Sequence, residues 1–249
     1  MKNNFFYQKP LASIYAKPSK KSEVVSQILF GEKFKILSKK KNWLKIKTDY
    51  DNYSGFIKNE KFTQKFKPTH KVYKLKTIIY KKKKNKFVSS TNFLFFASRI
   101  SSMNLSGQFI EFKKNSWVKK EDLKPVNFNE KNISKILKLF LNTKYLWGGK
   151  TSKGIDCSAL IQIYFYFNNI FFPRDTKDQA KFLKKNKINR LYKNDYLMYW
   201  KGHVSFVLNK NLLIHAYGPK KKVVIMPIKK TIELIKKTAN LKVKKIFPI

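Results

Sequence analysis

The chain has 249 residues and a formal net charge of +42, with 43% hydrophobic and 16% aromatic residues. This apolar content predicts folded domains and excludes a disordered chain, because such side chains can offset the entropy cost of ordering. The single cysteine excludes an internal disulfide, and three histidines without a second cysteine argue against a structural zinc site.

The positive charge has two interpretations. Only three of the 56 basic residues are arginines (Arg99, Arg174 and Arg190), whereas bidentate phosphate contacts favour arginine. Lysine, asparagine, isoleucine and phenylalanine are abundant throughout, as an AT-rich genome would produce. Composition therefore leaves open either biased residue usage or a polyanion-binding surface, and we do not expect nucleic acid as a partner.

The first 15 residues contain no long apolar run and no small-residue cleavage site, so a secretory signal is not expected. The longest apolar stretches are too short for a membrane span, which needs about 20 residues. We therefore expect a cytoplasmic protein without a membrane span, and its oligomeric state stays open.

Residues 1–63 contain short strand-like runs between turn residues, which predicts a small β-barrel. Residues 71–126 show a similar but less regular pattern, which predicts a second one. We expect residues 65–70 to form the linker, with His70 on the surface, and Lys81–Lys84 to form a solvated turn.

From residue 130 onward the pattern changes. Residues 132–141 have apolar positions three and four apart, with Asn129 or Asn132 available as the cap, which predicts an amphipathic helix. Residues 157–168 are apolar on nearly every face and predict a buried helix. Strands are expected at 196–200, 204–208, 212–216 and 223–226, so residues 130–249 are predicted to be an α+β domain.

The segment from Tyr145 to Leu160 places the only thiol, Cys157, after a glycine-rich loop and in the first turn of the buried helix. Free N–H groups and the helix dipole stabilise a thiolate there, so we expect a lowered pKa. The alternative is an ordinary buried cysteine in the core.

Two histidines favour the catalytic interpretation. A three-residue hairpin loop at 209–211, with asparagine in the left-handed conformation, would place residue 205 opposite residue 215. His203 and His215 would then share a face as diagonal neighbours, about 7–8 Å apart. This arrangement suits a relay in which one ring takes the thiol proton and the other orients it, although two unrelated strand histidines remain an alternative. Lys144 stands where a phosphate-binding loop needs glycine, and no serine-hydrolase elbow is present.

A set of short motifs carries a family resemblance. They are Tyr145-Leu-Trp-Gly-Gly, Asp156-Cys157-Ser158, Pro173-Arg174-Asp175-Thr176, Asn194-Asp195, Gly202-His203-Val204 and Ile214-His215-Ala216. In order and spacing they resemble the NlpC-type cysteine peptidases, which have a papain-like fold and cut peptidoglycan peptides. The upstream half resembles the bacterial SH3-like barrels of the dipeptidyl-peptidase VI subgroup.

The resemblance implies an α+β protein with two SH3-like barrels (1–63 and 71–126) before a catalytic domain (130–249). It implies hydrolysis of the γ-D-glutamyl-L-diamino-acid bond in peptidoglycan-derived peptides with a free N-terminal L-Ala, without a cofactor or metal. A non-catalytic protein that binds wall fragments or polyanions through its barrels and lysines is the alternative.

The resemblance also implies roles for individual residues. Cys157 would be the nucleophile, His203 the base, His215 the orienting residue and Tyr145 a neighbour of the oxyanion. The substrate-binding residues would be Asp156, Ser158, Asp175, Thr176, Glu32 and Tyr53. For Glu32, a solvated turn residue is an equal alternative. Ala159 and Asn194 stand where the family usually has glycine, which places substrate specificity in doubt more than catalysis.

Overall fold

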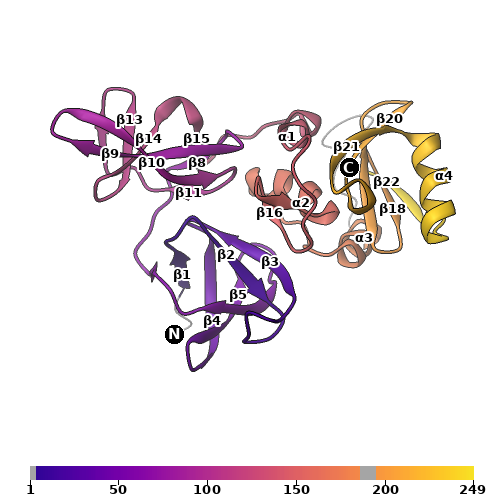
Figure 1. Ribbon diagram of the computed structural model, residues 1–249, viewed down its shortest axis with the longest axis horizontal. Coiled ribbons are helices and arrows are strands. Elements are labelled where there is room, and N and C mark those ends of the chain that lie inside the picture. The colour runs from indigo at the N-terminus through magenta and orange to yellow at the C-terminus, as the bar shows by residue number, and fades with distance from the viewer. Residues whose placement is uncertain (1–3, 186–194) are drawn as a thin grey trace. The chain divides into compact units, whose positions relative to one another are not determined.

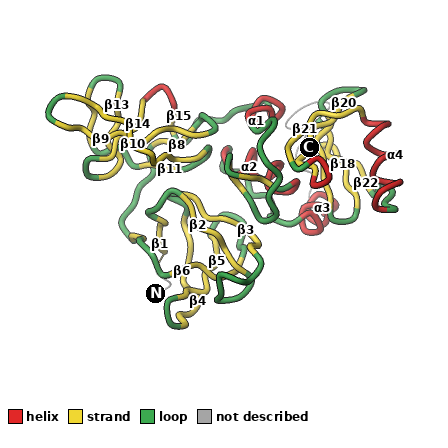
Figure 2. The backbone as a smooth tube through the Cα atoms, viewed as in Figure 1, coloured by secondary structure: helices red, strands yellow, loops and turns green. Residues whose placement is uncertain are grey.

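The computed structural model describes residues 4–185 and 195–249, and the chain forms two compact units, Met1–Phe128 and Asn129–Ile249 (Figure 1). The first unit (unit 1) is built from strands and the second (unit 2) combines helices with a sheet, so the fold is α+β. Figure 2 shows that the α-helices gather in unit 2.

The N-terminal part of unit 1 is a seven-stranded antiparallel sheet with strand order β3-β2-β6-β5-β4-β1-β7. Its bounds are β1 Asn4–Tyr7, β2 Leu11–Tyr15, β3 Val24–Leu29, β4 Lys33–Lys40, β5 Trp43–Thr48, β6 Ser54–Lys58 and β7 Phe62–Thr63. Leu44 and Ile46 are buried while Lys45 between them is exposed, which is the alternation of a half-buried strand. Within the described residues no pairing joins β3 to β7, so this sheet is not a closed barrel.

The remainder of unit 1 contains two smaller sheets, β10-β9-β14-β13-β12 and β11-β8-β15. Their strands are β8 His70–Val72, β9 Lys76–Lys83, β10 Lys86–Phe95, β11 Arg99–Ile100, β12 Asn104–Ser106, β13 Phe109–Lys113, β14 Ser116–Lys119 and β15 Leu123–Pro125. The strands of this region pair into one five-stranded and one three-stranded sheet. This pairing does not establish a second barrel, which stays a prediction.

The two parts of unit 1 pack closely. Phe30, which follows β3, lies in the core of the second part with Val72 and Ile110. Gly31 has a φ of +75°, and a Cβ there would lie 2.1 Å from the carbonyl oxygen of Arg99. Only glycine fits this position, since any side chain would collide with backbone.

Two expectations for this region are wrong. His70 is not a linker surface residue: it begins β8, is half-buried, and its Nδ1 lies 2.9 Å from the Thr69 hydroxyl. The lysine run at 81–84 is not all turn, because β9 continues to Lys83 and pairs with β10. The ladder satisfies the backbone groups of these residues, so their charge does not prevent a strand.

Unit 2 has a five-stranded antiparallel sheet with order β21-β20-β19-β18-β22. Its strands are β18 Tyr196–Trp200, β19 His203–Val207, β20 Leu212–Tyr217, β21 Lys222–Pro227 and β22 Lys245–Pro248, and β16 Lys150–Thr151 pairs separately with β17 Gly154–Ile155. The helices are α1 Ile133–Leu139, α2 Cys157–Phe167, α3 Thr176–Lys185 and α4 Ile228–Ala239.

Helix α2 is the centre of unit 2. All eleven of its residues are buried, and it packs against β19 and β20. Asn132 caps α1 by accepting a hydrogen bond from the Lys135 N–H, as the sequence allowed. None of the helices in residues 4–185 and 195–249 is long and apolar enough to span a membrane.

Candidate active site

The start of α2 is fixed by Asp156, its N-cap residue. Asp156 Oδ1 accepts a hydrogen bond from the Ala159 N–H at 2.8 Å, and Oδ2 accepts one from the Gly148 N–H at 3.0 Å. One carboxylate therefore joins the helix start to the preceding glycine loop. A Cβ on Gly149 would lie 2.4 Å from the carbonyl oxygen of Gly154, so the tight loop requires glycine. Ala159, in place of the usual glycine, does not disturb the cap.

Arg174 completes what we call the arginine cluster (Asp156, Ser158 and Arg174). Its guanidinium donates to both oxygens of Asp156, at 3.0 and 2.6 Å, and to Ser158 Oγ at 2.9 Å. Ser158 Oγ in turn donates to Asp156 Oδ1 at 3.1 Å. All three side chains are buried, and a bidentate pair of this kind is the strong form of charge-assisted hydrogen bond. Sequence reasoning gave no role to Arg174, although it lies in the quoted Pro-Arg-Asp-Thr motif.

Gln179 holds the segment after Arg174 against α2. Its Nε2 donates to the backbone oxygens of Ser158 at 3.0 Å and Pro173 at 2.9 Å, and its Oε1 accepts from the Tyr199 hydroxyl. Gln179 is completely buried, and sequence reasoning missed it because α3 itself was not predicted. Asp175 and Thr176 lie in this docked segment; Asp175 is exposed and Thr176 begins α3.

The Cys157 thiol lies against the turn that begins β19. Its Sγ is 4.0 Å from the Gly202 carbonyl oxygen, and the Val204 and Ser158 N–H groups stabilise its anion. Burial, and next the Asp156 charge, nevertheless raise the pKa of the thiol to about 12. The expected lowering is therefore wrong for this structure, because loss of hydration outweighs the helix-end N–H groups.

The β19–β20 hairpin has the predicted register. Phe206 pairs with Ile214 and Val207 with Leu213, so position 205 faces 215. The loop works differently from the expectation, since no residue from 209 to 211 has a positive φ. Instead, Asn209 Oδ1 accepts from the N–H groups of Asn211 and Leu212, both at 2.9 Å. This Asx-type turn replaces the left-handed asparagine.

The hairpin brings together what we call the histidine row (His203, His215 and Met226). His203 Nε2 lies 2.9 Å from His215 Nδ1, and His215 Nε2 lies 3.4 Å from the Met226 sulfur. Tyr217 stacks on the His215 ring with centroids 4.7 Å apart. Burial lowers the pKa of His203 to about 4; burial and then the His203 charge lower that of His215 to about 3. Both rings are therefore neutral at pH 7.

Tyr145 is close enough to Cys157 for the thiolate charge to act on its hydroxyl. Burial first, and then the negative charge of a Cys157 thiolate, raises the pKa of its hydroxyl, so the phenol is protonated at neutral pH. The Tyr145 ring also lies beside Gly218, where a Cβ would be 3.7 Å from two of its carbon atoms, an ordinary contact distance. A protonated phenol can donate a hydrogen bond to a developing oxyanion.

Glu32 and Tyr53 belong to unit 1, whereas the residues described above belong to unit 2. Glu32 follows Gly31 in a tight turn and is only 1% exposed, and its carboxylate accepts a hydrogen bond from the Leu29 N–H at 3.0 Å. The solvated-turn alternative for Glu32 is therefore wrong. Tyr53 is half-buried in the turn between β5 and β6, where its N–H donates to Thr48 Oγ1 at 2.9 Å.

No group of three or more histidine, cysteine, aspartate or glutamate side chains suited to a metal ion occurs within the described ranges. Asn194, one of the two family departures, lies outside the described residues.

Comparison with known families finds a match over the part of the chain that contains these residues. Residues 142–239, which include the thiol, both clusters and Tyr145, match the NlpC/P60 family. The chain carries an NlpC/P60 peptidase domain. Residues 14–62 match the bacterial dipeptidyl-peptidase Sh3 domain, so an SH3 domain precedes the peptidase domain.

Relatives share both parts. Dipeptidyl-peptidase 6 of Lysinibacillus sphaericus is 25% identical over 83% of this chain and 84% of its own length. The γ-D-glutamyl-L-lysine dipeptidyl-peptidase of Bacillus subtilis is 26% identical over 84% of this chain and 77% of its own. The crystal structure of an NlpC/P60 family protein from Bacillus cereus covers 90% of this chain and 94% of its own, with 18% identity and a TM-score of 0.73, which shows the shared fold.

Proposed function

We propose that this NlpC/P60 peptidase hydrolyses peptidoglycan-derived peptides at the γ-D-glutamyl-L-diamino-acid bond. The observation that carries the proposal is the position of the only thiol, in the first turn of a buried helix. Its Sγ lies 4.0 Å from the Gly202 carbonyl oxygen and also interacts with the Val204 N–H, so it contacts both sequence neighbours of His203. The names of the two relatives, a dipeptidyl-peptidase 6 and a γ-D-glutamyl-L-lysine dipeptidyl-peptidase, support the choice of bond.

The proposed reaction starts from a neutral thiol and a neutral imidazole. Cys157 Sγ attacks the γ-glutamyl carbonyl carbon while its proton passes to His203, so that a C–S bond forms. The Tyr145 hydroxyl and backbone N–H groups at the start of α2 stabilise the oxyanion. His203 then gives the proton to the leaving amine as the C–N bond breaks, and water hydrolyses the thioester.

We propose that the free N-terminal ammonium of the substrate is recognised by the segments around α2. Asp156, Ser158, Asp175 and Thr176 supply carboxylate and hydroxyl oxygens, and a desolvated ammonium needs such partners. Asp156 already accepts hydrogen bonds on both oxygens from Arg174, so the negative charge that balances an ammonium belongs chiefly to Asp175. The substrate roles of Glu32 and Tyr53 stay predictions.

A product assay tests the proposal. The peptide L-Ala-γ-D-Glu-L-Lys is incubated with the full chain, with Cys157→Ala, and with the control His70→Ala, whose histidine lies in unit 1. We expect L-Ala-γ-D-Glu and free lysine, identified by mass, from the wild type and His70→Ala only. An N-acetylated copy of the peptide should be cut much more slowly. Unchanged cleavage by Cys157→Ala would overturn the mechanism, and equal cleavage of the acetylated peptide would overturn the ammonium recognition.

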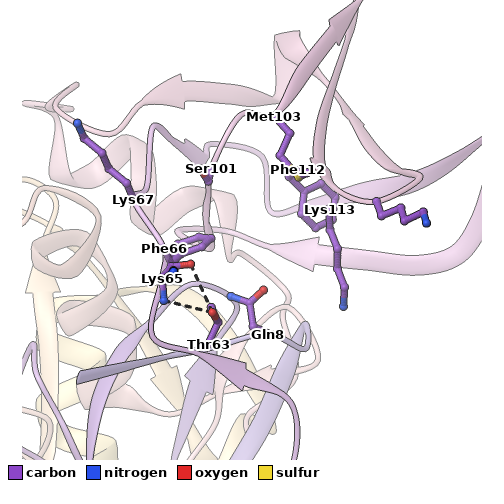
Figure 3. Close-up of a pocket in the computed structure, with 10 residues that line it drawn as sticks. Gln8, Thr63, Lys65, Phe66, Lys67, Ser101, Met103, Phe112 and Lys113 are labelled. Carbon is purple, nitrogen blue, oxygen red and sulfur yellow. Dashed lines mark hydrogen bonds between the residues drawn. The ribbon is translucent and has the colours of Figure 1, made fainter. Parts of the chain in front are cut away.

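A second activity, binding of polyanions, is favoured by a pocket in unit 1, in addition to hydrolysis (Figure 3). The pocket has a volume of about 620 Å³, and its lining includes four lysines but no acidic residue. They are Lys65, Lys67, Lys113 and Lys114. Partial burial and the charges of Lys61 and Lys81 lower the pKa of Lys113, so positive charge here is not fully compensated.

The test compares equal changes of charge. Lys113→Gln/Lys114→Gln removes two lysines of the pocket, and Lys229→Gln/Lys230→Gln removes two exposed lysines of α4. With inorganic polyphosphate as the probe, we expect the pocket variant to bind at least several-fold more weakly and to show a smaller salt dependence. Equal losses in both variants would mean that polyphosphate senses only the net charge.

A further inference from the structure

The histidine row ends on a sulfur atom. His215 is completely buried, and its Nε2 faces the sulfur of Met226 at 3.4 Å. Met226 is itself buried, with 8% of its surface exposed. In the β20–β21 ladder, Leu213 pairs with Met226 and His215 with Val224, so Met226 is the diagonal neighbour of His215 on the same face. The contact is therefore fixed by the sheet register.

A thioether limits what His215 can do. Its sulfur carries no hydrogen and is only a weak acceptor. A buried Nε2 that faces this sulfur therefore has a favourable contact only when the nitrogen carries a proton. Because a neutral imidazole has one proton, His215 Nδ1 must then be an acceptor, and the atom it accepts from is His203 Nε2, 2.9 Å away.

We propose that Met226 is a positioning residue that sets the tautomers of both histidines. The order of donors is His215 Nε2–H to sulfur and His203 Nε2–H to His215 Nδ1. His203 then keeps a free lone pair on Nδ1, which is the form that can take the Cys157 proton. This inference rests on the proposed function, in which His203 is the base.

The opposite order has a physical cost. His215 Nδ1–H would donate to His203 Nε2, and the lone pair of His215 Nε2 would point at the lone pairs of sulfur. That nitrogen would be a buried acceptor without a donor. The proton of His203 would move to Nδ1, and that nitrogen could no longer accept a proton from the thiol.

The direct test is long-range ¹H–¹⁵N correlation NMR of the full chain labelled with ¹⁵N-histidine. The chain has only three histidines, and His70→Gln assigns one of them. In the wild type at pH 7 we expect a protonated Nε2 and a bare Nδ1 for both His203 and His215. A protonated Nδ1 on His215 would overturn the inference, whatever the hydrolysis assay shows.

Matched variants test the cause. Met226→Leu removes the sulfur and keeps the bulk, and Met198→Leu makes the same change at another buried methionine of the same core cluster. We expect Met226→Leu to populate the second tautomer and to lower kcat about tenfold without a change in KM, because the acceptor for His215 Nε2–H is lost. Met198→Leu should keep the wild-type tautomers and a kcat within about twofold.

The two proposals fail in different ways. Unchanged tautomers and an unchanged kcat in Met226→Leu would overturn the role of Met226 while the peptidase mechanism stands. A lower kcat with unchanged tautomers would show a packing role and would also overturn it. Absence of hydrolysis by the wild type would overturn the proposed function. The NMR measurement would still determine the tautomers of His203 and His215.

Discussion

The two polar clusters of unit 2, the arginine cluster and the histidine row, differ in charge. The arginine cluster contains a full ion pair, and each Asp156 oxygen accepts several hydrogen bonds. The histidine row is neutral at pH 7 and ends on a weak acceptor. The first fixes the loop, the helix start and the α3 segment in place. The second contains protons whose positions can change.

The difference follows from what each cluster is required to do. A buried ion pair that loses one partner leaves an uncompensated charge, so it is suited to holding geometry. A neutral imidazole pair can accept a proton at one end without first breaking an ion pair. We infer that structural order and proton transfer are assigned to separate clusters, and the following variants test this separation.

The largest effect is expected from His203→Ala. Loss of a general base lowers rates by about 10²–10⁴-fold, so kcat/KM for the tripeptide should fall within that range. The free energy of unfolding should fall by about 1–3 kcal/mol, because the buried Nδ1 of His215 loses the N–H group from which it accepts a hydrogen bond. A rate within threefold of wild type, measured beside His70→Ala, would contradict the assignment of His203.

Arg174→Met should act chiefly on stability. It leaves the Asp156 carboxylate buried without its partner, and breaking a buried pair costs about 3–5 kcal/mol. Urea unfolding followed by tryptophan fluorescence measures the change. The double variant Asp156→Asn/Arg174→Met removes the stranded charge and should recover part of the loss. A single variant as stable as the wild type would show that the arginine cluster does not hold this region.

Local pattern was sufficient to predict several parts of the site. Loop length and the two-residue period of strands gave the β19–β20 register, and with it the His203–His215 contact. Apolar residues on all faces of 157–167 gave a buried helix. These features depend on residues close in sequence.

Other features depend on partners that sequence spacing does not reveal. Arg174 meets Asp156 across 18 residues, and Gln179 of α3 bonds the Ser158 carbonyl oxygen. Helix α3 itself is mostly polar, and its buried residues are Gln179 and Leu183, so few apolar positions marked it in the sequence. The raised pKa of Cys157 depends on how completely its surroundings exclude water, whereas the helix position alone suggested the opposite direction. Met226 reaches His215 only through the pairing of β20 with β21.

Acid should destabilise the folded chain through the histidine row. Burial lowers the pKa of His203 to about 4 and that of His215 to about 3, from 6.5 in the unfolded chain. Between these values the unfolded chain binds more protons, so the free energy of unfolding should decrease as pH falls from about 6.5 toward 4. Activity should persist to about pH 5 and fall through about pH 4, as His203 becomes protonated. A kcat/KM profile whose acid limb lies near pH 6.5 would mean that burial does not lower the pKa of His203.

Ser158→Ala should have the smallest effect. It tests whether the arginine cluster binds the substrate. Ser158 Oγ donates to Asp156 and accepts from Arg174, but both partners keep other hydrogen bonds, so the expected loss of stability is about 1 kcal/mol. If the hydroxyl also binds the substrate ammonium, KM for the free-amine peptide should rise about fivefold, while the slow cleavage of the acetylated peptide should not change. An equal change for both peptides would confine Ser158 to holding the helix start. The arginine cluster would then be structural throughout, and recognition of the ammonium would shift to Asp175 and Thr176.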